Sequence, residues 1–133
     1  MTTNASHTRL VDVLADRSID IDAVLAQHTR FRSPYADYRG REDVVHLVDQ
    51  IRHVLGDLHL DRQLADARTT MTAFEARVGD EAVQGVLVEE RDDEGRVADA
   101  MLTVRPYTGL RAAMRAMQAL MEESPLPSRR AAS

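Results

Sequence analysis

The chain has 133 residues, 17 basic and 22 acidic, with a net charge of −5 and no cysteine. This length suits one ordinary domain, and the 44% hydrophobic share argues against disorder. The lack of cysteine excludes disulfides and cysteine-ligated zinc, and the acidic balance argues against a nucleic-acid partner. No targeting segment or apolar window of roughly 20 residues is visible, so we expect a cytoplasmic protein without a membrane partner.

The first half of the chain has the spacing of helices around one short strand. Apolar residues recur at helical intervals over 8–16 and again over 19–27, which predicts two short helices. Residues 29–34 favour a strand, and residues 35–40 favour a loop. The apolar stripe over 41–55, with acids in its first turn and Gly56 after it, predicts a longer helix.

The second half changes to the alternation that is typical of strands. Residues 58–64, 69–78, 82–90 and 97–106 alternate or are rich in strand formers, with turn signals at 79–80 and 92–95. A final helical stripe over 108–121 follows, with Thr108 as its expected cap. We expect one domain over 1–123 and a flexible tail over 124–133. This order of elements predicts an α+β fold.

The two predicted turns assign the strand residues to two faces. A two-residue turn places Phe74 opposite Gly85 and Thr72 opposite Leu87, and the next turn places Gly85 opposite Leu102. One face is then nearly all apolar and should cover the helices. The other face carries an apolar patch rimmed by charges, which predicts a homodimer interface. The patch residues are Met71, Val86, Val88 and Met101.

Several short motifs resemble one known superfamily. They are Phe31-Arg-Ser-Pro34, Tyr38-Arg-Gly40-Arg before the long helix, the strand around Gly85, Asp93-Glu-Gly-Arg-Val97 and Val104-Arg-Pro106. In this order they resemble the nuclear transport factor 2-like superfamily, specifically the SnoaL-like bacterial proteins. The resemblance covers most of the chain, from Leu10 to Met121.

The resemblance implies a strongly curved antiparallel sheet wrapped around helices as a cone with a deep apolar pocket, usually in a homodimer. The superfamily includes ketosteroid isomerase, limonene epoxide hydrolase, scytalone dehydratase and polyketide cyclases, and also non-catalytic binding and scaffold proteins. The fold therefore does not by itself define an activity.

The acidic residues depart from the pattern of the enzymes. Relatives often carry an acid two residues after the glycine of the middle strand, where this chain has Leu87. Glu89 is the ionisable group that the register places on the inner face, near the strand end, where a solvated acid is the plainer interpretation. Burial would instead raise its pKa and suit a general base. Asp99 falls on the outer face, where we expect an ion pair at the dimer rim.

We expect the cone pocket to bind a small apolar molecule, oriented by Tyr35, Tyr38 or Glu89. The residues expected to line the pocket are Phe31, Tyr35, Tyr38, Phe74, Leu87, Glu89, Ala100, Leu102 and Met117. One alternative is a cofactor-free isomerase, cyclase or hydrolase with Glu89 as base and Tyr38 as donor. Another is a homodimeric scaffold whose cone is filled by its own side chains.

The sequence predicts neither a metal nor a cofactor. His46 and His53 lie two helical turns apart, about 10.5 Å, which is too far for one shared ion without further ligands. His59 and Asp61 are too few to hold zinc. No glycine-rich nucleotide or cofactor fingerprint occurs.

Overall fold

The structure, a computed structural model, describes residues 8–131 and combines one six-stranded sheet with helices. The predicted α+β fold is confirmed. The elements in chain order are α1 (Leu10–Ala15), the 3-10 helix η2 (Ile21–Ala23), β1 (Leu25–Arg32), β2 (Asp37–Arg39), α2 (Arg41–Val54), β3 (Gly56–Ala65), β4 (Thr69–Val78), β5 (Glu81–Arg91), β6 (Val97–Arg105), α3 (Tyr107–Glu123) and α4 (Pro127–Ala131).

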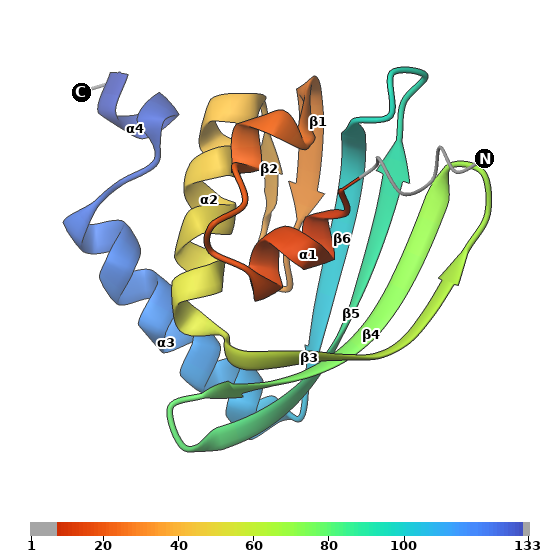
Figure 1. Cartoon of the computed structure of the whole chain (residues 1–133). Coiled ribbons are helices and arrows are strands. Elements are labelled where there is room, and N and C mark those ends of the chain that lie inside the picture. The colour runs from red at the N-terminus through yellow and green to blue at the C-terminus, as the bar shows by residue number, and fades with distance from the viewer. Residues whose placement is uncertain (1–7, 132–133) are drawn as a thin grey trace.

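The sheet curves around the helices, as Figure 1 shows. Its strand order is β2-β1-β6-β5-β4-β3. Neighbouring strands are antiparallel except β1 and β6, which are parallel. α1 and α2 lie on the concave side, and α3 begins where β6 ends and runs beside α2 (Figure 1). No helix in the described part of the chain is long and apolar enough to cross a membrane.

The region before α2 differs from the prediction. The second predicted helix, over 19–27, is wrong: only Ile21–Ala23 is helical, and β1 already begins at Leu25. The cause is pairing with β6, where the Val97 amide donates to the Val24 carbonyl at 2.8 Å. Tertiary hydrogen bonds thus outweigh a weak local preference. Antiparallel pairing with β1 likewise explains β2, which is a strand where a loop was expected.

The register of the central strands confirms the first hairpin and shifts the second. Phe74 lies opposite Gly85, as predicted. Gly85, however, lies opposite Val104 and not Leu102, because the turn closes with a hydrogen bond from the Asp92 amide to the Arg96 carbonyl and β5 is irregular after Glu90. The shift is two residues, so the residues paired between Gln84 and Glu90 and their partners on β6 keep their predicted faces. Beyond the irregularity Val97, which was not assigned to the inner face, is buried in the core.

The described segment after α3 packs on α2 at Leu126 and Ser128, where a flexible tail was expected. Leu126 is buried, and the Ser128 amide and hydroxyl donate to the Asp43 carboxylate at 3.0 and 2.6 Å. Pro106, and not Thr108, precedes the first residue of α3. A domain boundary at residue 123 stays a prediction.

Candidate functional site

The concave face of the sheet brings together most of the predicted pocket residues. β1, β4, β5 and β6 contribute side chains that are 0 to 5% exposed: Phe31, Phe74, Leu87, Ala100 and Leu102. They come from strands far apart in the sequence and form one apolar surface. The alternation of each strand explains this, because every second side chain points to the same face.

α1 fills the space in front of this apolar surface (Figure 1). Its residues Leu10, Val11, Val13 and Leu14 are 0 to 3% exposed, so they point into the core from one broad face of a short helix. Such low exposure leaves no room for a water molecule against these side chains. The apolar surface that we expected to line a pocket is therefore covered by α1, and the two form one continuous core.

Glu89 meets the N-terminus of α1 inside the cone. Its Oε1 accepts a hydrogen bond from the Leu10 amide at 2.7 Å, and its Oε2 accepts one from the Val11 amide at 3.1 Å. These amides belong to the first helical turn, which has no partners within the helix and favours an anion. Glu89 is 0% exposed. The interpretation as a solvated acid at a strand end is therefore wrong.

Burial sets the protonation behaviour of Glu89. Loss of hydration raises the pKa of the Glu89 carboxyl above its ordinary value, while the two amide hydrogen bonds partly lower it. A buried acid with a raised pKa is a recognised feature of functional sites.

A small group of polar side chains surrounds Glu89 on the strands beside it. Thr70 lies directly opposite Glu89, and its hydroxyl is buried without a hydrogen-bond partner among the described residues. The next inner residue on the same strand, Thr72, is engaged: Gln63 Nε2 donates to its Oγ1 at 2.9 Å, and Arg9 Nη1 donates to Gln63 Oε1 at 2.6 Å. The sequence feature that could have indicated these residues is the pair of threonines at alternate inner positions of β4.

The remaining predicted residues lie apart from Glu89. Tyr38 shares its row across the sheet, through Ala100 and Phe31, but lies three strands away, about 14 Å along the sheet. Burial raises the pKa of the Tyr38 phenol. Tyr35 is 75% exposed, and Met117 of α3 packs against the edge of the core. The structure therefore does not bring a base and a tyrosine donor together.

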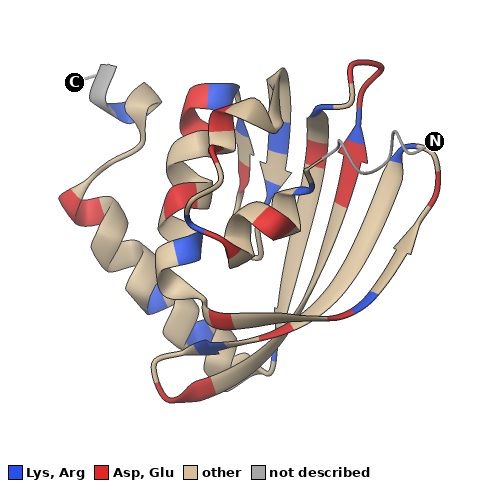
Figure 2. Cartoon of the chain, in the orientation of Figure 1, with Lys and Arg blue, Asp and Glu red and all other residues tan. Residues whose placement is uncertain are grey.

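The convex face carries the predicted apolar patch. The register places Leu64, Met71, Val88 and Met101 in one row across β3 to β6. Leu64 is 65% and Met71 45% exposed. Charged residues gather toward the strand ends and leave the middle of β5 and β6 largely uncharged (Figure 2).

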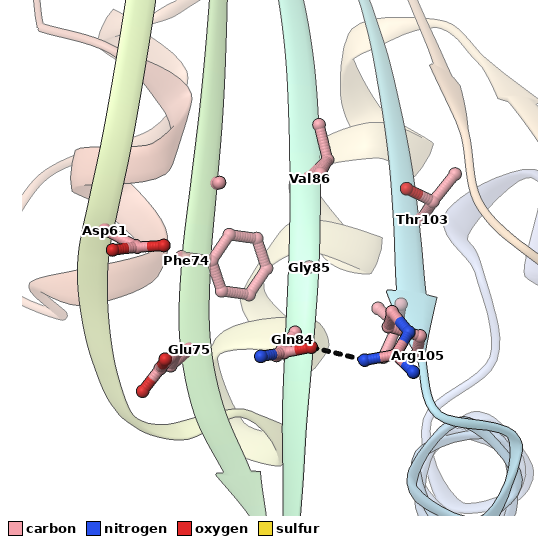
Figure 3. A pocket seen from close by; sticks show the side chains of 10 residues that line it. Asp61, Phe74, Glu75, Gln84, Gly85, Val86, Thr103 and Arg105 are labelled. Atoms are coloured by element: carbon pink, nitrogen blue, oxygen red, sulfur yellow. Dashed lines mark hydrogen bonds between the residues drawn. The ribbon is translucent and has the colours of Figure 1, made fainter.

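A groove of about 300 Å³ lies on the convex side at Gly85. Figure 3 shows Gln84 and Arg105 hydrogen-bonded on one side of it, with Asp61 and Glu75 on the other. Its lining is mixed polar and apolar. It adjoins the apolar patch through Val86.

Asp99 lies on the outer face, as predicted, and pairs there with two arginines of β1, while its place at a dimer rim stays a prediction. Its two oxygens accept from Arg30 Nε and Arg32 Nη2, each at 2.7 Å. Burial alone would raise the pKa of the Asp99 carboxyl, but the hydrogen bonds and charges of the two arginines hold it below its ordinary value.

The fold and its geometry match solved structures. A steroid delta-isomerase from Pseudomonas aeruginosa is 33% identical over 77% of each chain, with a TM-score of 0.73. An uncharacterised protein with a cystatin-like fold from Silicibacter pomeroyi is 24% identical, over 93% of this chain and 89% of that one, with a TM-score of 0.82. An NTF2-like protein of unknown function from Mesorhizobium loti is 20% identical, over 65% of this chain and 75% of that one, with a TM-score of 0.59.

No protein-family model and no curated protein matches the chain. The solved structures nonetheless define its family: the chain belongs to the nuclear transport factor 2-like, SnoaL-like superfamily. The resemblance inferred from the sequence motifs is confirmed.

Proposed function

We propose that this protein binds a small apolar molecule on the concave face of the sheet, in the space that α1 fills here. The observation that carries the proposal is Glu89, a buried carboxylate beside an apolar surface. Both of its hydrogen bonds within the described residues come from α1. The similarity to a protein named as a steroid delta-isomerase supports a ligand of steroid size.

Packing alone does not call for an acid at this position. Removing a carboxylate from water costs several kcal/mol, even when hydrogen bonds compensate part of the loss. Leu87, two residues earlier on the same face, is fully buried without any such cost. In this structure the two α1 amides are the groups that Glu89 binds, and we propose that a polar group of the ligand can take their place.

Methyl NMR tests the proposal. Titration of the protein with androstanol, a saturated steroid alcohol, should shift the methyl signals of Leu87, Ala100 and Leu102. The exposed methyl of Ala119 on α3 serves as the control and should not move. If the concave-face methyls stay unchanged up to the solubility limit of androstanol and of its ketone, androstanone, the binding proposal is wrong and the self-filled scaffold takes its place.

A second candidate is a cofactor-free isomerase, cyclase or hydrolase with Glu89 as general base. The raised pKa of the Glu89 carboxyl favours it, because a base works best near the operating pH. A steroid delta-isomerase assay tests the isomerase case: Glu89→Gln should abolish turnover, while Tyr38→Phe should preserve it because Tyr38 lies far from Glu89. Activity that survives Glu89→Gln would exclude Glu89 as the base.

We also propose that the convex face binds a second copy of this chain. The row of Leu64, Met71, Val88 and Met101 is apolar, and acidic Glu90 and basic Arg30 lie on one side of it, so a two-fold related copy meets both apolar and complementary charged groups. Val88→Arg should convert the dimer to a monomer in sedimentation, while Ala119→Arg on α3 should not. A dimer that persists in Val88→Arg would refute this interface. The cytoplasmic location stays a prediction.

A further inference from the structure

We infer that the ligand of the concave face is an apolar alcohol or amine whose polar group takes the place of the α1 amides at Glu89 and also binds Thr70. This inference rests on the binding function proposed above and specifies the chemistry of the ligand. α1 itself serves as the guide, because it occupies the site in the way that such a ligand would.

The Glu89 carboxylate requires hydrogen-bond donors. α1 offers two N–H donors to the carboxylate, at 2.7 and 3.1 Å, and places aliphatic side chains behind them. An ionised carboxylate only accepts hydrogen bonds. A molecule that replaces α1 must therefore bring a donor, or it leaves a buried acceptor unpaired. A hydroxyl or an amine meets this need, and a ketone or an ester does not while Glu89 is ionised.

Thr70 offers a second polar group to the ligand. It lies directly opposite Glu89 on the inner face, an arrangement that sets the two Cβ atoms about 4.5 to 5.5 Å apart. Its hydroxyl is buried and has no partner in the part of the chain that the structure describes. A ligand hydroxyl that donates to Glu89 can accept from Thr70, and an amine can donate to both. Thr72, the next inner residue, already accepts from Gln63.

The buried residues of α1 indicate the size of the apolar part of the ligand. α1 has only six residues, and Ala15 and Asp16 directly after its buried positions are exposed. A molecule that takes its place must bury as much apolar surface as two leucine and two valine side chains, which is the scale of a fused-ring hydrocarbon. Because α1 and the ligand compete, apparent affinity falls with the fraction of molecules in which α1 has left the site.

Calorimetric titration with androstanol, androstanone and the parent hydrocarbon androstane measures how much the polar group of the ligand contributes to affinity. The wild type should bind androstanol at least about tenfold more tightly than androstanone, since a site built around hydrogen bonds rejects an analogue that lacks the donor. Thr70→Val, which keeps the side-chain shape, should reduce this preference. Thr103→Val on the exposed convex side should leave it unchanged. Leu14→Ala and Val11→Ala should tighten the binding of all three molecules, because each weakens α1.

The possible results separate this inference from the function on which it rests. Equal affinity for androstanol and androstanone, together with shifts of the Leu87 and Leu102 methyls, would overturn the inference and leave apolar binding in place. Weaker binding after both α1 substitutions would show that α1 forms part of the site and would also overturn it. If none of the three molecules binds the wild type or either α1 variant, the proposed function itself fails.

Discussion

The ring of Phe74 lies across the backbone of Gly85, so closely that a Cβ on residue 85 would stand 2.3 Å from the ring Cζ. The two residues are directly opposed on β4 and β5, as Figure 3 shows from the convex side. Glycine within a strand commonly marks such a close approach. The missing side chain lets the aromatic ring fill the middle of the cone.

Gly85→Ala should therefore destabilise the protein by about 1 to 3 kcal/mol, because the added methyl has no free space. Chemical denaturation measures the effect. Gly56→Ala is the matched control on β3, since its Cβ would meet only the Arg77 carbonyl at an ordinary 3.7 Å. Combining Gly85→Ala with Phe74→Leu should recover part of the loss. Equal effects of the two glycine substitutions would contradict the explanation.

The raised pKa of Glu89 predicts a pH dependence of stability. The native carboxyl holds its proton to a higher pH than the unfolded chain, whose ordinary value is 4.5. The native state thus binds more protons in that window, and the contribution of Glu89 to the free energy of unfolding falls as pH rises from about 4.5 through the native pKa. Urea unfolding of wild type and Glu89→Gln from pH 4 to 8 should show this fall in their difference. A rise instead would mean that the native pKa lies below the unfolded one.

Asp99 should behave in the opposite way. The pKa of Asp99 is lowered in the native state, so Asp99 stabilises the native state at pH values above its ordinary pKa of 3.8. This contribution to stability is lost as the pH falls through the lower native pKa. Asp99→Asn should cost about 1 to 2 kcal/mol at neutral pH, since it weakens the contacts to Arg30 and Arg32. Thermal unfolding at pH 7 and pH 3 tests this, with exposed Asp61→Asn as the control. A loss as large at pH 3 as at pH 7 would argue against the charge pairing.

The packing of α4 predicts a cost for changes beyond residue 123. Leu126 is buried at 7% exposure, so Leu126→Ala should lower the free energy of unfolding by about 1 to 3 kcal/mol. Arg129→Ala, at an exposed position of α4 three residues further on, should have little effect. Urea unfolding of both variants measures the difference. No loss in Leu126→Ala would support the flexible tail that the sequence predicts.

The sequence predicted features that depend on local geometry and missed those that depend on distant partners. The turn at Gly79 determined the pairing of Phe74 with Gly85, because a tight hairpin fixes its register. Leu25 lies in a helical pattern, but its partner Val97 is far along the chain. The placement of Glu89 on the inner face of the sheet was predicted correctly. Its burial was not, because the α1 amides that bind it are 78 and 79 residues away.

The parallel pairing of β1 with β6 has a consequence for synthesis on the ribosome. β3 to β6 pair in the order in which they are made, so each strand meets its neighbour soon after it emerges. Phe31, in contrast, leaves the ribosome long before its partner Ala100 exists. The N-terminal segment, including α1, must wait with its apolar side chains unprotected until β6 is complete. The nascent chain thus stays exposed to aggregation and to chaperones until β6 has been made.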